Sequence, residues 1–276
     1  MSASPRSPAQ APRPAADAVN LRAVAPPGVV PGRIWRAGAG AVMDAGTADE
    51  LTQRHGLRAV IDLRSPSERD RAGAPAELLA HGVRWTRTPL TGYPRDIVHL
   101  PRPTPDHYVR YYHAILMEST VGGVPALFEA LASAADEPFL VCCHLGKDRT
   151  AVVVAALLAL ADVPDELIAE DYAASGTALG PLLDRFAHKW RAHGWTREDY
   201  VVHLSTPAVI MRTWLAELRQ RHGGVRASLI RAGARPADLT ALSAALTDPC
   251  ADRPDDPPTG PSSGPRPSGT RGGDRP

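Results

Sequence analysis

A thiol and a guanidinium stand at the two ends of a short segment in the middle of the chain. Five residues separate Cys143 from Arg149, and Thr150 follows. A loop that joins a buried strand to the start of a helix points several backbone N–H groups inward and makes a concave site for an oxyanion. Arg149, entering the helix, can hold two phosphate oxygens in bidentate fashion. The spacing predicts a phosphate-binding loop with a thiol beneath the phosphorus.

Such a loop also changes the chemistry of the thiol. A cysteine with the ordinary pKa near 8.5 is only about 3% ionised at pH 7, whereas a pKa near ~5 makes it almost wholly thiolate. The positive field that binds phosphate acts in this direction. Gly146 can adopt the positive φ that a tight loop often needs. We therefore expect Cys143 to be a nucleophile and Thr150 to hydrogen-bond its sulfur and help it leave.

The loop resembles that of a known family. Cys-x5-Arg-Thr, in the fuller form Gly-Lys-Asp-Arg-Thr at 146–150, is similar to the phosphate loop of the bacterial and fungal branch of the protein-tyrosine-phosphatase superfamily. The resemblance implies hydrolysis of phosphotyrosine or phosphoinositide monoesters through a phosphocysteine intermediate, with no metal or other cofactor. It also implies two sets of site residues. The catalytic residues are Cys143, Asp148 and Arg149, and the remaining phosphate-loop residues are His144, Leu145, Gly146, Lys147 and Thr150.

Two positions depart from the family pattern. The family usually has His immediately before the nucleophile, whereas this chain has Cys142, and Ala151 stands where Gly tends to follow the threonine. The resemblance implies that the His orders the loop by hydrogen bonding, so the thiolate has less support here. His144, on the other side of the nucleophile, is a candidate for part of the missing positive charge.

The oxygen that leaves a phosphomonoester needs a proton, and a carboxyl group near the loop is the usual donor. Asp148 matches an aspartate that is characteristic of this family branch, and we favour it as the general acid. Asp96 and Asp106 are alternatives, because they lie in or next to a long segment, 90–105, that is predicted to be a lid. The competing role for Asp148 is to pair with a neighbouring cation and shape the loop.

Alternating strands and helices position this loop. Strands are predicted at 59–63, 83–89 and 139–141. Helices are predicted at 47–55, 151–160, 165–174, 206–221, 225–232 and 236–246, with two more around Tyr108–Ile115 and Val124–Leu131. Thr47 is the predicted cap of the first of these helices, and Thr206 is the predicted cap of the helix at 206–221. The alternation predicts an α/β fold with a small, mostly parallel central sheet flanked by helices, and a helical C-terminal lobe. Asp62 and Arg64 end one strand, where such sheets place their sites. They either support the site or form an ion pair that braces the loop.

The two ends of the chain differ from its middle. Residues 1–19 are rich in Ala, Pro and Ser, and 248–276 contain no Leu, Ile, Val, Met or aromatic residue. Both are expected to be disordered, which leaves 20–247 as the phosphatase domain. No run approaches the roughly eighteen apolar residues of a membrane span.

The charge and the cysteine content limit the classes of binding partner and the compartment that we expect. A net charge of +1 gives no global field for nucleic acid or an anionic membrane. Three cysteines, two of them adjacent, do not make a disulfide framework, which favours the reduced cytoplasm. The sequence specifies no oligomeric state.

Three functions compete at this point. The first is a phosphatase of phosphotyrosine or phosphoinositides, the second a phosphatase of a small soluble metabolite such as a sugar or nucleoside phosphate. The third is a phosphate-binding pseudophosphatase, for which the absent His is the support. Arsenate reduction needs further cysteines to resolve its intermediate, and Cys142 and Cys250 are poorly placed for that.

Overall fold

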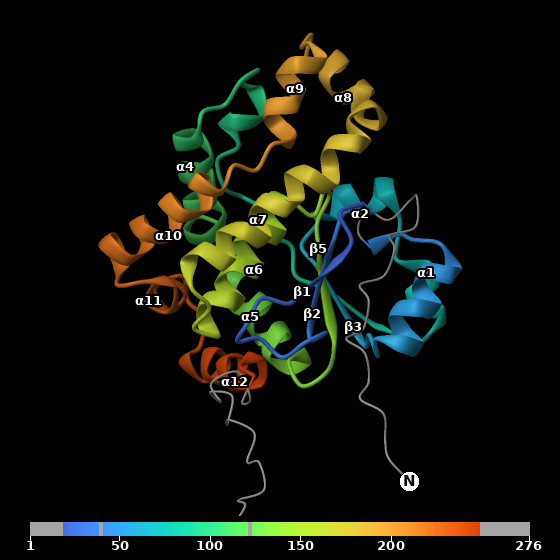
Figure 1. The fold of residues 1–276 in the computed structure, drawn as a ribbon, viewed down its shortest axis with the longest axis vertical. Coiled ribbons are helices and arrows are strands. Elements are labelled where there is room, and N and C mark those ends of the chain that lie inside the picture. The colour runs from blue at the N-terminus through green and yellow to red at the C-terminus, as the bar shows by residue number, and fades with distance from the viewer. Residues whose placement is uncertain (1–18, 39–40, 121–122, 249–276) are drawn as a thin grey trace, which may run out of the picture.

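A computed structural model describes residues 19–38, 41–120 and 123–248. Of the two segments predicted to be disordered, 1–19 and 248–276, only residues 19 and 248 are among the described residues. A five-stranded sheet stands at its centre (Figure 1). In spatial order the strands are β1 (Arg22–Val24), β2 (Ile34–Ala37), β5 (Phe139–Cys142), β3 (Ala59–Asp62) and β4 (Arg84–Arg87). Only the β1–β2 pair is antiparallel. The predicted small, mostly parallel sheet is confirmed.

The central strand β5 positions the candidate site. All four of its residues are buried, as expected for a strand with parallel neighbours on both sides. Cys142, its last residue, lies opposite Ala37 of β2 and Asp62 of β3. The chain therefore leaves three neighbouring strands at the same edge of the sheet, and Cys143 is the first residue beyond the middle one.

Helices cover both faces of the sheet (Figure 1). One face carries α1 (Ala45–Asp49), α2 (Pro66–Ala72) and α3 (Ala76–Ala80). The other carries α4 (Pro105–Met117), α5 (Gly123–Ala134), α6 (Asp148–Leu160), α7 (Asp165–Leu179), α10 (Ala208–His222), α11 (Val225–Arg231) and α12 (Pro236–Leu246). Alternation along β5 assigns Leu140 and Cys142 to the smaller core and Phe139 and Val141 to the larger.

A separate group of short helices lies beyond the carboxyl edge of the sheet, at the top of Figure 1. It comprises a 3-10 segment (Gly180–Phe186), α8 (Ala187–Ala192) and α9 (Arg197–Leu204), and we call it the α8–α9 lobe. It has its own small core, which includes Phe186, Trp190 and Tyr200. Leu145 of the phosphate loop packs against that core. Since every element after α6 is helical, the predicted helical C-terminal part is confirmed.

Two predicted helix caps are wrong. The cap of α1 is Asp44, whose side chain accepts a hydrogen bond from the Thr47 backbone N–H, and the helix continues as a π-helical turn, Glu50–Arg54. The hydroxyl of Thr206 does not cap α10. It accepts from the backbone of Gly176 at 2.7 Å and so ties the start of α10 to α7. A neighbouring side chain replaced the predicted cap at Thr47, and a tertiary contact with a backbone N–H replaced it at Thr206.

Other boundaries shifted because of tertiary contacts. Two short helices, α2 and α3, fill the connection between β3 and β4, where no helix was predicted. The predicted lid segment 90–105 contains a 3-10 turn, Asp96–His99, and Tyr93 within it is buried. α6 begins three residues earlier than predicted, at Asp148, so that Arg149 already belongs to the helix.

Candidate active site

The backbone of the phosphate loop is turned so that its carbonyls point away from the concave side. Nδ2 of Asn20 donates to the carbonyl of Gly146 at 2.8 Å and to that of Leu145 at 3.3 Å. Nη2 of Arg36 donates to the same Gly146 carbonyl at 2.8 Å. In a trans peptide the N–H points opposite to the carbonyl. The N–H groups of the residues that follow these carbonyls therefore point into the loop, where they can bind an oxyanion.

Glycine is required at two points where the loop touches β2. Gly146 has a φ of +64°, and a Cβ there would lie 2.5 Å from the carbonyl carbon of Ala37. A Cβ on Gly38 would lie 2.6 Å from the carbonyl carbon of Leu145. No side chain fits between the two backbones, so both glycines allow the close approach that orders the loop.

A buried cluster of charges holds this side of the loop. Asp171 of α7 forms an ion pair with Arg36, and its backbone carbonyl accepts from Nη2 of Arg22 at 2.7 Å. Arg22 also donates to Ser175 at 3.0 Å. Burial, with the nearby Arg36 charge, lowers the pKa of Arg22 to about 10. The 171–175 segment therefore packs against the site through Arg36, which binds the loop, and through Arg22, which donates to Oδ1 of Asn20.

Arg149 is held by a carboxylate from the other side of the sheet. Its Nη1 and Nη2 donate to the two oxygens of Glu68 on α2 at 2.8 and 2.6 Å, and Nη1 also donates to the carbonyl of Leu63 at 3.2 Å. A guanidinium has five N–H donors. These bonds occupy three of them and leave Nε–H and one Nη2–H, which share an edge. That edge has no acceptor among the described residues and has the geometry for two phosphate oxygens.

Glu68 is a site residue that the sequence analysis missed. It also completes the capping box of α2, since its Oε2 accepts from the backbone N–H of Ser65 at 2.8 Å. Burial opposes its charge, but the hydrogen bonds from Arg149, the charge of Arg149 and the hydrogen bonds from Ser65 together outweigh burial and lower the pKa of Glu68 to about 2. The Ser65-x-x-Glu68 spacing signals a helix start. The partnership with Arg149 is not visible in the sequence.

The candidate general acid, Asp148, has one oxygen held and one free. Oδ1 accepts from the Tyr112 hydroxyl at 2.9 Å and lies 3.3 Å from Nζ of Lys147. Burial keeps the pKa of Tyr112 well above its usual range. Because Tyr112 donates its only proton to Asp148, its 2.9 Å contact with the Tyr172 hydroxyl is one in which Tyr172 donates. Oδ2 has no protein partner among the described residues, and the side chain is 25% exposed.

Lys147 does not face the concave side of the loop. It is buried, and its ammonium pairs with Asp148, donates to the backbone carbonyl of His203 and lies 4.6 Å from the ring centroid of Tyr108. Burial lowers the pKa of the ammonium, but the charge and hydrogen bond of Asp148, with the nearby Tyr108 and Tyr172, together outweigh burial, and the net direction is upward. Lys147 therefore fastens the loop to the α8–α9 lobe.

The remaining carboxylate candidates fall into two groups. Asp62 and Arg64 form a fully buried pair with an Nη2–Oδ2 distance of 2.8 Å, and Asp62 also accepts from the indole of Trp85. These contacts favour the bracing role, at the turn that leads to Glu68. Asp96 and Asp106 are exposed, and neither forms a hydrogen bond or ion pair with the described residues of the loop.

Two adjacent thiols have different surroundings. Cys142 is buried in the smaller core, where burial and then the Asp62 charge raise its pKa well above the usual value. Cys143 is 3% exposed and belongs to the other face, next to the charge of Arg149. The hydroxyl of Thr150 is buried and has no hydrogen-bond partner among the described residues, the Cys143 sulfur included.

Two residues that the sequence analysis did not single out lie within electrostatic reach of Cys143. Tyr93, from the predicted lid segment, is buried, and burial raises the pKa of its phenol while the Arg149 charge lowers it. Its ring packs edge-on to Tyr111 with centroids 5.7 Å apart. Lys189 on α8 donates to Nε2 of His144. Neither position carries a local sequence signal, because both reach the site through long-range packing.

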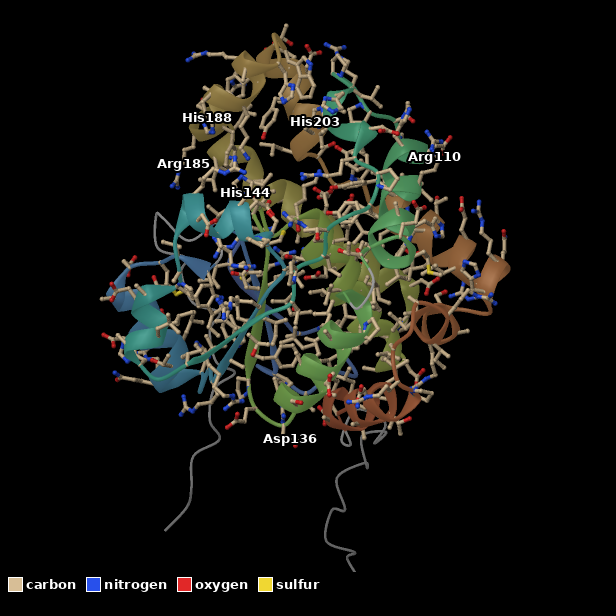
Figure 2. The ribbon with its side chains drawn as sticks, turned by 180° about the vertical axis from the view of Figure 1, so that it is seen from behind. Arg110, Asp136, His144, Arg185, His188 and His203 are labelled. Atoms are coloured by element: carbon tan, nitrogen blue, oxygen red, sulfur yellow. The ribbon has the colours of Figure 1, made fainter. Side chains whose placement is uncertain are left out.

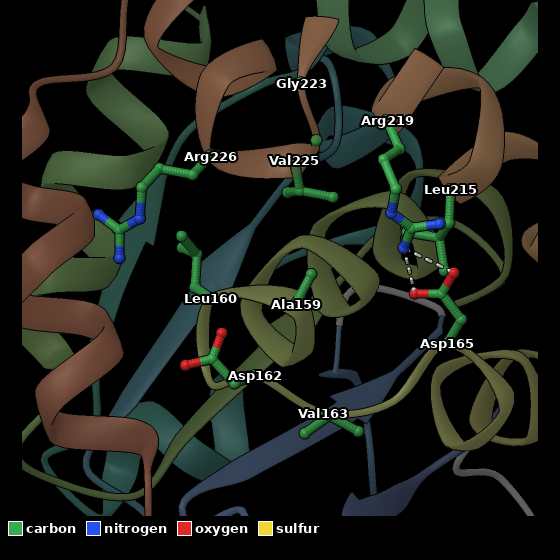
Figure 3. A pocket seen from close by; sticks show the side chains of 11 residues that line it. Ala159, Leu160, Asp162, Val163, Asp165, Leu215, Arg219, Gly223, Val225 and Arg226 are labelled. Carbon is green, nitrogen blue, oxygen red and sulfur yellow. Dashed lines mark hydrogen bonds and ion pairs between the residues drawn. The ribbon is translucent and has the colours of Figure 1, made fainter.

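Away from this site, a cavity of about 320 Å³ lies at the other end of α6 (Figure 3). Its lining includes Leu160, Val225 and the ion pair between Asp165 and Arg219, at 2.8 Å. It lies about 18 Å along the helix from the loop and shares none of its groups. In the described part of the chain, no His, Cys, Asp or Glu side chains gather in threes to hold a metal ion, and no helix is long and apolar enough to cross a membrane.

The chain was compared with known protein families and structures. The model of the tyrosine phosphatase family matches residues 17–248. No curated protein matched the chain. Among solved structures, the core catalytic domain of the PP-IP phosphatase SIW14 from S. cerevisiae, in complex with citrate, is 17% identical over 55% of this chain and 73% of that chain, with a TM-score of 0.29.

A second solved structure, PTPMT1 in complex with PI(5)P, is 14% identical over 78% of this chain and 90% of that chain, with a TM-score of 0.26. The family match covers most of the chain and includes the Cys-x5-Arg loop, which the fold places at the carboxyl edge of the sheet. The chain belongs to the tyrosine phosphatase family and is a phosphoric monoester hydrolase.

Proposed function

We propose that this chain hydrolyses phosphotyrosine or phosphoinositide-type monoesters through a phosphocysteine intermediate. One observation carries the proposal: Arg149 is fixed by Glu68 so that the Nε/Nη2 edge of its guanidinium has no protein acceptor among the described residues. Together with the inward N–H groups of the loop, that edge can donate hydrogen bonds to the equatorial oxygens of the phosphoryl group in the transition state of its transfer.

The first step is an in-line attack. The Cys143 thiolate forms an S–P bond as the bond from phosphorus to the ester oxygen breaks. Asp148 gives its proton to the departing oxygen through Oδ2, since Oδ1 is already held by Tyr112 and Lys147. The alcohol or phenol then leaves.

The second step regenerates the enzyme. Water attacks phosphorus, the S–P bond breaks, and Asp148 recovers a proton from the water. The hydroxyl of Thr150, which is buried without a partner among the described residues, is close in sequence to the departing sulfur and can donate to it. Phosphate is the product, and Cys143 is free for the next cycle.

The substrate class is tested with a panel. Phosphotyrosine peptides, phosphoinositides in vesicles, sugar phosphates and nucleoside monophosphates should be offered to the purified chain. We expect the first two to be turned over with the highest kcat/KM. A preference for the soluble metabolites would replace our substrate class, and no turnover of any ester would favour a phosphate-binding protein.

The intermediate is tested with Cys143→Ser. We expect turnover to be lost while phosphate still binds, because the serine hydroxyl is not ionised at neutral pH. Cys142→Ser is the matched control and should stay active, since Cys142 lies in the core on the other face of the sheet. Rapid acid quench of the wild type with a labelled substrate should trap label on Cys143. Activity in Cys143→Ser would end the proposal.

The described part of the chain leaves Cys142 and Cys143 as free thiols. A nucleophilic thiol is preserved by a reducing environment. We therefore propose the cytoplasm as the working compartment.

A further inference from the structure

A chain of buried tyrosine hydroxyls leads from the helical core to the candidate acid. The Tyr112 hydroxyl donates to Oδ1 of Asp148 at 2.9 Å, and the Tyr172 hydroxyl lies 2.9 Å from that of Tyr112. The two tyrosines are 0% and 1% exposed. Burial raises both pKa values above the usual range, so both phenols keep their protons at neutral pH. Donation therefore runs from Tyr172 through Tyr112 to Asp148.

The position of the Tyr112 hydroxyl is fixed by three helices other than α6. Tyr112 lies on α4, and its ring meets that of Tyr172 on α7 edge-on, with the centroids 5.9 Å apart. It also meets the ring of Trp214 on α10 edge-on, at 6.4 Å and with the two planes at 90°. A ring that is packed between two others in a dense core moves only if the helices that carry them move. Tyr112 therefore donates to Asp148 from a fixed point.

The second group at Oδ1 is a cation that is held from the lobe. Nζ of Lys147 lies 3.3 Å from this oxygen and donates to the backbone carbonyl of His203. Figure 2 shows His203 on the lobe, at the place where α9 approaches α4. His144 is neutral at pH 7, because burial, followed by the charge of Lys189, lowers its pKa to about 4. The expectation that His144 supplies positive charge beside the nucleophile is therefore wrong.

The two groups at Oδ1 decide which oxygen of Asp148 carries the proton. Oδ1 accepts from a hydroxyl and faces an ammonium, whereas Oδ2 has no protein partner among the described residues. When the proton passes from Oδ2 to the ester oxygen, the electron pair of the broken O–H bond stays on the carboxyl group. The hydrogen bond from Tyr112 then has a charged acceptor and becomes stronger. An interaction that strengthens in the transition state lowers the barrier.

We infer that Tyr112 is a positioning residue for proton transfer to the leaving group, and that Tyr172 supports it. Tyr112 orients the Asp148 carboxyl so that Oδ2 carries the proton, and it stabilises the carboxylate that forms. Tyr172 donates to the oxygen of the Tyr112 hydroxyl and so fixes the direction in which that hydroxyl donates. The inference rests on the proposed role of Asp148 as the general acid.

The test compares two leaving groups. Tyr112→Phe keeps the ring with its edge-on contacts and removes only the hydroxyl. We expect kcat for an alkyl phosphate to fall by between about tenfold and 10²-fold, which is the contribution of a hydrogen bond to a charged group. The kcat for nitrophenyl phosphate, whose leaving group needs little help from an acid, should stay close to that of the wild type. Tyr172→Phe should show a smaller loss with the same selectivity.

Tyr200→Phe is the matched control. It removes a hydroxyl from the core of the α8–α9 lobe, where Tyr200 forms no hydrogen bond with the described residues through its side chain. We expect it to change the rate with neither substrate.

A double-mutant cycle separates positioning from a structural role. If Tyr112 acts through Asp148, adding Tyr112→Phe to Asp148→Asn should cause no further loss with the alkyl phosphate. Equal losses with both substrates in Tyr112→Phe, or an undiminished further loss in the double variant, would overturn the inference. If Tyr112→Phe does not fold, Tyr172→Phe takes its place in the same cycle.

The inference and the proposed acid fail in different ways. A selective defect in Asp148→Asn without one in Tyr112→Phe would overturn the inference and leave Asp148 as the acid. The absence of a selective defect in Asp148→Asn would overturn both.

Discussion

Glu68 and Arg149 are 81 residues apart in the chain and are joined by two nearly parallel hydrogen bonds, at 2.8 and 2.6 Å. One residue opens a helix on one face of the sheet, and the other opens a helix on the opposite face. The contact therefore passes across the carboxyl edge of the sheet, directly beside the phosphate loop. It decides which edge of the guanidinium is presented to a substrate.

Replacing Glu68 tests this relationship. In Glu68→Gln the amide accepts through one oxygen only, so Arg149 loses one of its two hydrogen bonds to residue 68 and its guanidinium rotates more freely. We expect kcat to fall by between about tenfold and 10²-fold, as for other small displacements of a catalytic group. Glu77→Gln, on the next helix, is the control and should leave the rate unchanged. A wild-type rate in Glu68→Gln would show that Arg149 is positioned by other means.

The same pair makes a pH-dependent contribution to stability. The pKa of Glu68 in the folded protein, about 2, is lower than the ordinary pKa of a glutamate, 4.5. Its contribution is thus fully present above about pH 4.5 and is lost as the pH falls toward 2. Urea unfolding of wild type and Glu68→Gln should show a stability difference at pH 6 that shrinks at pH 3. A difference that grows on acidification would contradict this sign.

Arg149→Lys exchanges a planar fork for a point charge. The lysine cannot bind two phosphate oxygens in a planar bidentate contact, and it cannot reproduce the two-point contact of the guanidinium with Glu68. We expect a fall in kcat of about 10² or more, by analogy with the loss of one preorganised donor. Steady-state kinetics with nitrophenyl phosphate measure this. A loss below about tenfold would count against the bidentate role.

Asp148→Asn tests the general acid through the leaving group. Removal of an acid should harm alkyl phosphates, whose leaving groups are strongly basic, much more than nitrophenyl phosphate. Asp96→Asn and Asp106→Asn are the matched comparisons. We expect neither to show the selective defect, since both carboxyls are exposed and form no hydrogen bond or ion pair with the described residues of the loop. Equal slowing of both substrates by Asp148→Asn would assign that residue to loop structure alone.

Gly146→Ala tests the close contact between the loop and β2. The new methyl group would lie 2.5 Å from the carbonyl carbon of Ala37, at a φ of +64°. We expect a loss of stability of roughly 1–3 kcal/mol or more and weaker phosphate binding. Gly32→Ala has a similar φ, +73°, with nothing within 4 Å, and therefore measures the backbone strain alone. Equal losses in the two variants would show that the contact is unimportant.

The alternation of strands and helices around the Cys-x5-Arg loop could be predicted because its signals are local. The apolar run 139–141 and the Cys-x5-Arg spacing lie within a dozen residues, so neighbouring residues specify the strand, the loop and the helix that follows it. The helix-period stripes containing Tyr112 and Leu127 likewise predicted buried faces that the structure confirms.

The sequence predicted helix caps less well, because more than one hydrogen-bond partner was available to the capping residues. Thr47 and Thr206 both fit a capping pattern, but Asp44 caps one helix and the other hydroxyl binds across to α7. A hydroxyl accepts whichever donor the fold brings to it, and the sequence does not show which that is.

By itself, then, the sequence determined the reaction class, the Cys-x5-Arg motif and the alternation of strands and helices, since these depend on residues close together in the chain. Only the tertiary structure decided the partners of those residues. Glu68 reaches Arg149, Asp171 reaches Arg36, and Lys189 reaches His144 across separations of 81, 135 and 45 residues. Such pairs depend on how whole helices pack against the sheet, and the local spacing of residues does not predict them.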